Sequence, residues 1–110
     1  MSQLEVHRER EGSVAIVTFR GEFDYAETAT AQDEIHAAEA EDPAILLLDL
    51  ADLDFLDSSA VRVILQADGR ARAQGRRLAL ITGTGPPHRV LSILGLTERL
   101  DVVANRTVVL

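Results

Sequence analysis

A serine between a strand-like run and a helix-like run is the residue of this chain best placed for chemistry. Asp57, Ser58 and Ser59 follow the apolar residues 45–50 and an acidic stretch, and they precede a helical pattern. The first turn of a helix has backbone N–H groups without intrahelical partners and carries the positive end of the macrodipole. We therefore expect Ser58 to suit a phosphate. The alternative is that Ser58 is an ordinary N-cap, because serine is among the preferred caps, and the two roles are compatible.

The aspartates near this junction raise the question of a calcium loop. Asp49, Asp52, Asp54 and Asp57 lie close together in the sequence. Read as an EF-hand loop from Asp52, however, the chain has Asp57 where the sixth position requires glycine and Val63 where the twelfth requires glutamate. The calcium interpretation fails, and we expect no metal site. Asp52 and Asp54 are then interpreted as residues of a solvated loop.

Other motifs of catalysis or cofactor binding are incomplete. Residues 83–85, Gly-Thr-Gly, lie between a predicted strand and a predicted helix, but His88 occupies the third glycine position of a dinucleotide loop, so we expect a turn. The histidines lack the spacing of metal ligands, and Ser58 is not in a Gly-x-Ser-x-Gly elbow. No convergent acid, base and nucleophile are present, so we expect neither an enzyme nor a cofactor.

The strands that must position this site alternate with helices. Residues 4–8 and 14–19 flank a turn and predict an N-terminal β-hairpin, while residues 45–50 are apolar enough for a central strand. Residues 78–81 and 100–103 predict two further strands. The order predicts an α/β fold, with a mixed, mostly parallel sheet and helices packed against it, in one domain over residues 1–110.

Three helices are predicted from caps and apolar stripes. The first starts at Asp24 as N-cap, with Glu27 completing an aspartate version of the capping box, and it ends before Pro43. The second starts at Ser58 and ends at Gly75. A short third helix ends at Gly95. Their expected apolar stripes are Ala26, Ala29, Ile35 and Ala38 in the first, Val61, Ile64, Leu65 and Ala71 in the second, and Val90, Leu91 and Leu94 in the third.

Composition narrows the class of protein. The 110 residues include no cysteine, which excludes disulfides and thiolate metal sites, and no apolar run approaches the length of a membrane span. The charged start argues against a signal peptide, so we expect a cytoplasmic protein that does not bind a membrane. The net charge of −7 disfavours nucleic-acid binding and favours a protein partner.

Several motifs resemble the STAS domain family. Leu48-Asp49-Leu50, an acidic spacer with Leu53, Phe55 and Leu56, and then Asp57-Ser58-Ser59 resemble its signature, in particular that of the anti-sigma factor antagonist branch. Gly21-Glu22-Phe23-Asp24 is similar to the family's Gly-Glu-Leu-Asp. Gly95-Leu96, followed by Leu100 and Val102, is similar to the family's usual ending.

The resemblance implies a phosphorylation switch. The family's phosphorylated serine corresponds to Ser58, and Asp24, Asp57, Ser59 and Arg62 are the candidates for partner contacts. The implied partners are an anti-sigma factor with serine kinase activity, which the unphosphorylated form binds to release a sigma factor, and a PP2C-type phosphatase. The chain itself would be a monomer or a weak homodimer.

One departure from the family pattern supports an alternative function. Ala60 stands where the motif commonly has glycine, and it adds a methyl group where a kinase or partner would approach. The alternative is a STAS scaffold, or a subunit of a transport complex, whose serine is not phosphorylated.

Overall fold

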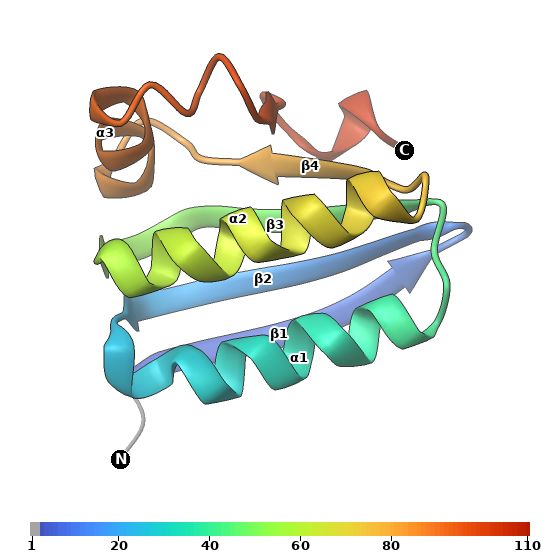
Figure 1. The fold of residues 1–110 in the computed structure, drawn as a ribbon, viewed down its shortest axis with the longest axis horizontal. Helices are drawn as coiled ribbons and strands as arrows, with labels where there is room; N and C mark the ends of the chain where they lie inside the picture. The colour runs from blue at the N-terminus through green and yellow to red at the C-terminus, as the bar shows by residue number, and fades with distance from the viewer. Residues whose placement is uncertain (1–2) are drawn as a thin grey trace.

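A five-stranded sheet forms the centre of the computed structural model, which describes residues 3–110 (Figure 1). The strands are β1 (Leu4–Glu11), β2 (Val14–Phe23), β3 (Ile45–Leu56), β4 (Arg77–Ile81) and β5 (Asp101–Val102). They lie side by side in chain order; β1 and β2 are antiparallel, and every later pair is parallel. The prediction of a mixed, mostly parallel sheet that begins with a hairpin is confirmed.

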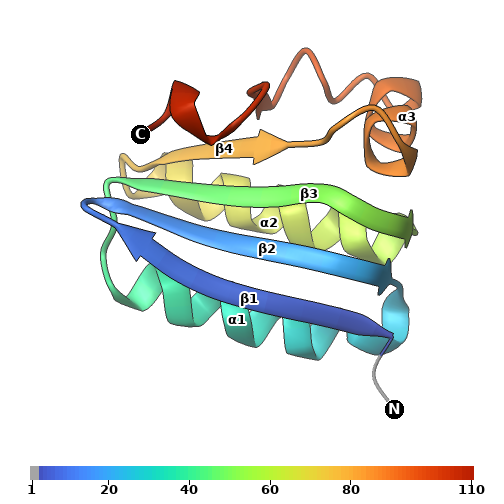
Figure 2. The same cartoon turned by 180° about the vertical axis from the view of Figure 1, so that it is seen from behind.

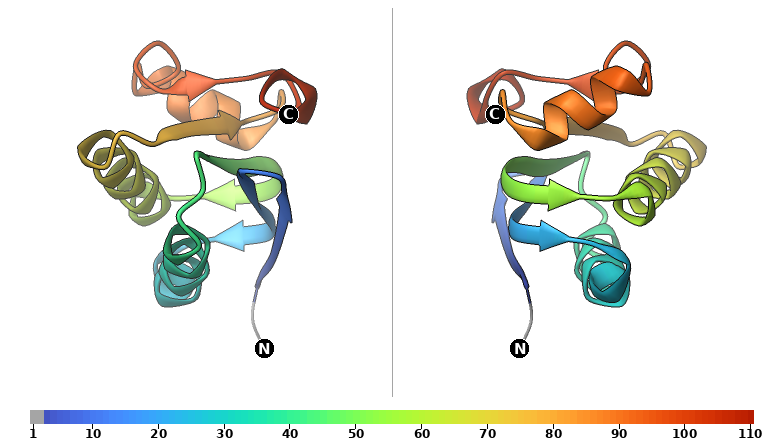
Figure 3. Two further views of the ribbon diagram at one scale, coloured as in Figure 1. Left: turned by 90° about the vertical axis from the view of Figure 1, so that its right-hand side faces the viewer. Right: turned by 90° about the vertical axis from the view of Figure 1, so that its left-hand side faces the viewer.

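Two long helices cover one face of this sheet. α1 (Thr28–Ala40) and α2 (Ser58–Ala73) pack side by side on the same face, and α3 (Pro86–Ile93) lies beyond the end of β4 (Figures 1 and 3). A short 3-10 helix, η1 (Tyr25–Glu27), precedes α1, and a second one, η2 (Arg106–Val108), follows β5. The right-handed connections of successive parallel strands place both long helices on the same side.

The main core lies between these helices and the sheet. Alternate residues of the inner strands point toward the helices and are fully buried, as the two-residue period of a strand requires. They include Val17, Phe19, Leu46, Leu48, Leu50 and Leu80. The opposite face carries a smaller apolar cluster, which the C-terminal segment covers with Val103 and Val109 (Figure 2).

β3 is longer than its apolar run predicts. It extends to Leu56, because its backbone stays paired with β2 across two register irregularities as far as Phe23. Asp52 and Asp54 are therefore exposed residues of a strand, and their interpretation as a solvated loop is wrong. Asp52 lies opposite Arg20 and forms an ion pair with it at 3.5 Å. In the sequence, polar residues at exposed positions of a strand look the same as polar residues of a loop. The hydrogen bonds to the backbone of β2 decide that this segment is a strand.

The predicted apolar stripes are partly wrong. Ala26 and Ala29 are exposed, because the α-helix begins only at Thr28 and turns Ala31, Ile35 and Ala38 toward the core. In α2, Leu65 is 40% exposed, while Val63 and Ala67 take buried positions beside the predicted Val61, Ile64 and Ala71. In α3, Leu91 is buried, but Leu94 is 54% exposed. Alanine and leucine occur on either face of a helix, so the burial is decided by the packing.

The predicted helix ends at Gly75 and Gly95 are confirmed. Both glycines have positive φ, of 67° and 71°, and each is followed by a residue whose N–H donates back into the last turn. After α2, the N–H of Arg76 donates to the carbonyl of Ala71 at 2.8 Å, and after α3 the N–H of Leu96 donates to that of Leu91 at 2.8 Å. This is the Schellman arrangement, for which glycine at the left-handed position is the usual residue.

Candidate functional site

Ser58 lies at the carboxyl end of β3, where that strand passes into α2. It is the first residue of α2 and is exposed, and its hydroxyl makes no hydrogen bond within the part of the chain that the structure describes. The N-cap is Asp57, with extended backbone at φ −111° and ψ −172°. The interpretation of Ser58 as an ordinary N-cap is therefore wrong, because the preceding aspartate already has that role.

The carboxylate of Asp57 connects the starts of two helices. Its Oδ1 accepts hydrogen bonds from the N–H groups of Ser59 at 2.9 Å and Ala60 at 3.2 Å, which caps α2. Its Oδ2 accepts from the N–H of Tyr25 at 3.1 Å, at the start of η1. This second contact has no local sequence signal, because a residue 32 positions away supplies the donor. One side chain thus positions both segments that flank Ser58.

Asp24 does not cap a helix with its side chain. The predicted capping box with Glu27 is absent: Asp24 makes no capping hydrogen bond, and the carboxylate of Glu27 accepts from the N–H of Gln3 at 2.9 Å. The geometric reason is that η1 intervenes and its first N–H is taken by Asp57. Asp24 Oδ1 is buried and has no hydrogen-bond partner among the described residues. A carboxylate oxygen in this state is desolvated without compensation.

The structure brings the five predicted site residues to one end of the sheet. Ser58, Ser59 and Arg62 lie in the first turns of α2, with Asp57 immediately before them. Asp24 adjoins this group, because Asp57 accepts from the N–H of the next residue, Tyr25, and donates its own N–H to the carbonyl of Phe23 at 3.3 Å. Ser59 is half-buried, while Ser58 and Arg62 are exposed.

An apolar groove lies on one side of Ser58. It has a volume of about 340 Å³ and is lined by Leu56, Asp57, Ser58 and Val61 together with Val90, Ile93 and Leu94 of the α3 region. Ile93 is 84% exposed, which is unusual for an isoleucine in a small domain. No local sequence pattern predicts that α3 lies beside the start of α2. The apolar residues at the end of α3 show only that this helix has a hydrophobic side.

A more polar groove lies on the other side of Ser58, between α1 and α2. Its volume is about 200 Å³, and its lining includes Tyr25, Thr28, Gln32, Ser59 and Arg62. Tyr25 is 77% exposed. Tyr25 has no sequence signal for this position, because its neighbours in the chain do not indicate that it lines a groove beside Ser58.

The residues 83–85 form a turn, as expected. Gly83 has φ +64°, and a Cβ at this position would lie 3.1 Å from the Cβ of Ala51 in β3. The glycine is thus explained by a left-handed turn that approaches a neighbouring strand, without a phosphate cradle. Over residues 3–110, no three side chains of the metal-ligating types gather in one place, and no helix there has the length and apolarity needed to cross a membrane.

The STAS domain family model matches residues 5–107 of the chain. The chain belongs to the STAS domain family. This STAS domain is also 27% identical over 103 residues to a protein called anti-sigma F factor antagonist from Paenibacillus polymyxa, across 93% of this chain and 88% of that protein. The matched segment contains all five predicted site residues, so the suspected family is confirmed on the part of the chain that carries them.

Solved structures share the fold of this STAS domain. An anti-sigma factor antagonist from Mycobacterium paratuberculosis superposes with a TM-score of 0.84 at 19% identity, covering 93% of this chain and 86% of that one. The phosphorylated form of the Bacillus cell fate determinant SpoIIAA gives a TM-score of 0.70 at 18% identity, covering 92% and 93%. At these identities the comparison shows a common fold.

Proposed function

We propose that this STAS domain is an anti-sigma factor antagonist whose switch is Ser58. The unphosphorylated form binds an anti-sigma factor with serine kinase activity and thereby releases a sigma factor. Phosphorylation of Ser58 ends this binding, and a PP2C-type phosphatase restores it. The observation that carries the proposal is the position of Ser58, which is exposed and flanked by two grooves, and whose hydroxyl makes no hydrogen bond within the described chain. The names of the sequence relative and of the fold neighbours support it.

The STAS domain acts as substrate of the kinase in this proposal. The Ser58 hydroxyl oxygen attacks the γ-phosphorus of ATP, ADP leaves, and the hydroxyl proton passes to a base that the kinase supplies. Asp57 is unsuited to be that base, because its carboxylate already accepts three backbone hydrogen bonds.

The charge of a phosphate on Ser58 is expected to have different effects on the fold and on the interface with a partner. A phosphate adds about −1.5 to −2 charges and three acceptor oxygens. At an exposed helix start it remains solvated, so the fold persists. In an interface formed around a neutral hydroxyl, it meets desolvation and the nearby carboxylates of Asp24 and Asp57, which opposes binding.

Phosphate mapping tests the acceptor. The chain is incubated with ATP and candidate anti-sigma factors that have a serine kinase fold, and the modified residue is located by mass spectrometry. Modification of Ser58 is expected, since its hydroxyl is more accessible than that of the half-buried Ser59. Phosphate on Ser59 alone would falsify the assignment.

Binding measurements test the switch. Ser58→Ala keeps the site neutral and should bind the anti-sigma factor, whereas Ser58→Asp and the phosphorylated protein should bind at least about tenfold more weakly, or about 1.4 kcal/mol. Ser13→Asp is a matched control, because it adds the same charge in the hairpin turn at the other end of β2. Equal affinities for the Ala, Asp and phosphorylated forms would favour a scaffold or a transport-complex subunit instead.

Ala60 gives no support to that alternative function. Its side chain is fully buried in the main core, so its methyl group points away from an approaching kinase. The departure from glycine therefore adds a methyl group to the core beneath α2.

A further inference from the structure

The start of α2 has few free donors to offer a phosphate. Asp57 Oδ1 accepts from the N–H groups of Ser59 and Ala60, and the carbonyl of Asp57 accepts from the N–H of Val61 at 3.2 Å. The helix start was expected to hold the phosphate, but the N–H groups of Ser59, Ala60 and Val61 already have acceptors. A phosphate on Ser58, which rests on the proposed function, would also lie next to the negative charge of Asp57. Its stabilisation requires a cation from elsewhere.

Arg62 is a cation without an acidic partner. Of the eleven basic residues, all of them arginine, eight lie within 4.0 Å of a carboxylate. The described structure shows no such partner for Arg62, Arg89 or Arg99. This is notable in a chain with 18 acidic residues, where acidic partners are abundant. Arg62 is therefore available to a negative group that the unmodified chain lacks.

Ser58 and Arg62 occupy one exposed ridge of α2. They are four residues apart, both are exposed, and the positions between them include the buried Ala60 and Val61. Residues at i and i+4 of a helix have Cβ atoms about 5–6 Å apart, and a negative group four residues before a positive one is the favourable order. A phosphate oxygen and a guanidinium on these two side chains can therefore meet, and guanidinium is well suited to phosphate.

We propose that Arg62 is the intramolecular counter-ion of phosphoserine 58. In the unmodified chain Arg62 is one of the residues that line the polar groove, with Tyr25, Thr28 and Gln32. Phosphorylation draws its guanidinium along the ridge toward Ser58. One modification thus changes two surfaces: it adds negative charge at Ser58, and it removes a basic group from the polar groove.

Arg89 is the competing cation. It precedes Val90, which lines the apolar groove together with Ser58, and it too has no acidic partner in the described chain. Arg89 lies on a different helix, however, so its approach depends on the packing of α3, whereas Arg62 lies one turn along the same helix. The carboxylates on the near side, Asp24 and Asp57, repel the phosphate equally in both cases.

Titration of the phosphate by ³¹P NMR tests the proposal. Phosphoserine is incorporated at position 58 during synthesis of the full chain, so no kinase is needed and the result is independent of whether the anti-sigma factor modifies Ser58. The second pKa of phosphoserine is about 6, and a nearby cation lowers it. Arg62→Gln is expected to raise this pKa by about 0.2 to 0.4 units relative to the parent, from the usual strength of an i to i+4 pair.

Arg99→Gln is the matched control and should leave the phosphate pKa unchanged. It removes the same charge, but its backbone lies beside Arg72, which is about 21 Å along α2 from Ser58 and beyond the screening length at physiological salt. An unchanged pKa in Arg62→Gln would overturn the proposal. A rise in Arg89→Gln without one in Arg62→Gln would also overturn it, because the counter-ion would then come from α3.

Discussion

At the scale of single residues, Asp57, the aspartate before Ser58, matters most to the structure of the candidate site. Asp57 accepts backbone hydrogen bonds from α2 with one oxygen and from η1 with the other. Its sequence position suggested a partner contact, whereas its geometry first explains how the site is built. A residue with this role affects folding and function together, so the two effects must be separated by measurement.

Asp57→Asn is expected to lower the free energy of unfolding by about 1–2 kcal/mol. Asparagine is a good N-cap and its amide oxygen can still accept from Ser59 and Ala60. Its amide nitrogen would then face the N–H of Tyr25, which places two donors together. Urea denaturation measures the change. Asp54→Asn, on an exposed strand position, is the control, and equal unfolding midpoints for the two variants would contradict the bridging role of Asp57.

Asp24→Asn is expected to leave the stability unchanged within about 0.5 kcal/mol, or to raise it. The reason is that Asp24 provides no cap and has a buried oxygen without a partner, so removing its charge relieves a desolvation cost. The same variant should weaken binding of the anti-sigma factor about tenfold, since it removes the negative charge that would attract a basic group of the partner. Thermal unfolding and titration calorimetry measure the two effects. A loss of stability equal to that of a missing N-cap would show that Asp24 is mainly structural.

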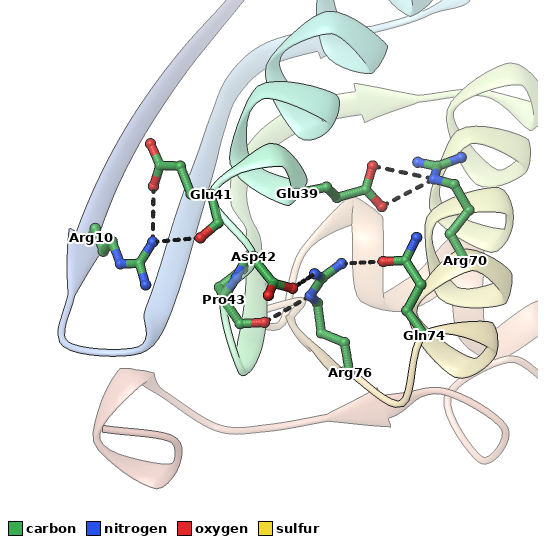
Figure 4. A network of polar contacts seen from close by, with 8 residues as sticks. All are labelled: Arg10, Glu39, Glu41, Asp42, Pro43, Arg70, Gln74 and Arg76. Atoms are coloured by element: carbon green, nitrogen blue, oxygen red, sulfur yellow. Dashed lines mark hydrogen bonds and ion pairs between the residues drawn. The ribbon is translucent and has the colours of Figure 1, made fainter.

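At the scale of elements, ion pairs and hydrogen bonds connect the C-terminal ends of α1 and α2, which lie far from Ser58. Arg70 of α2 donates to both oxygens of Glu39 of α1, at 3.0 and 3.2 Å (Figure 4). Arg76, just after α2, donates to the carbonyl of Pro43 at 2.7 Å, and it pairs with Asp42 at 2.9 Å. These contacts hold α1, α2 and the start of β3 together, and they thereby fix the direction in which α2 presents its first turn.

Arg76→Ala is expected to lower the free energy of unfolding by about 1–3 kcal/mol. The side chain of Arg76 is 5% exposed, so its loss leaves the Pro43 carbonyl without its donor and removes packing beneath the loop. Arg20→Ala is the control, because the side chains of Arg20 and its partner Asp52 are 65% and 59% exposed, so that their ion pair is solvated. Chemical denaturation compares them. Similar losses in both variants would show that the Arg76 contacts contribute no more than a surface ion pair.

At the scale of the whole molecule, the sheet brings the candidate site residues together at one end. The carboxyl ends of β2 and β3 are adjacent because the strands are parallel, and so the segments that follow them, η1 and α2, start side by side (Figure 1). α3 follows the end of β4 at the same edge of the sheet. Parallel α/β sheets commonly use this edge for binding, because the connecting loops and helix starts meet there.

The net charge of −7 predicts that binding of a basic anti-sigma factor surface depends on salt. The association rate constant should fall severalfold as the salt concentration rises from about 0.05 to about 0.5 M, because screening removes long-range attraction. The dissociation rate should change much less, since the apolar groove beside Ser58 is insensitive to screening. Stopped-flow fluorescence separates the two rates. An association rate independent of salt would show that the charge of this domain does not steer the encounter.

The sequence by itself determined the fold class, the family and the position of the candidate serine. Local signals carried these predictions: alternating strands and helices, glycines at the helix ends, and the Asp-Ser-Ser motif after an apolar strand. Such signals are readable because each depends on residues a few positions apart. The resemblance singled out Asp24 and Asp57 as partner contacts, and the roles of these two residues, of Ser59 and of Arg62 in binding stay predictions.

The tertiary structure alone decided which residues surround Ser58 and how they are held. The bond from Tyr25 to Asp57 joins residues 32 positions apart, and the apolar groove combines α2 with Ile93 and Leu94 of the α3 region. The same long-range packing turned Leu65 outward, buried the methyl group of Ala60 and kept Asp54 within a strand. Burial and hydrogen bonding between distant segments depend on where the sheet places them, which is why no local pattern could predict them.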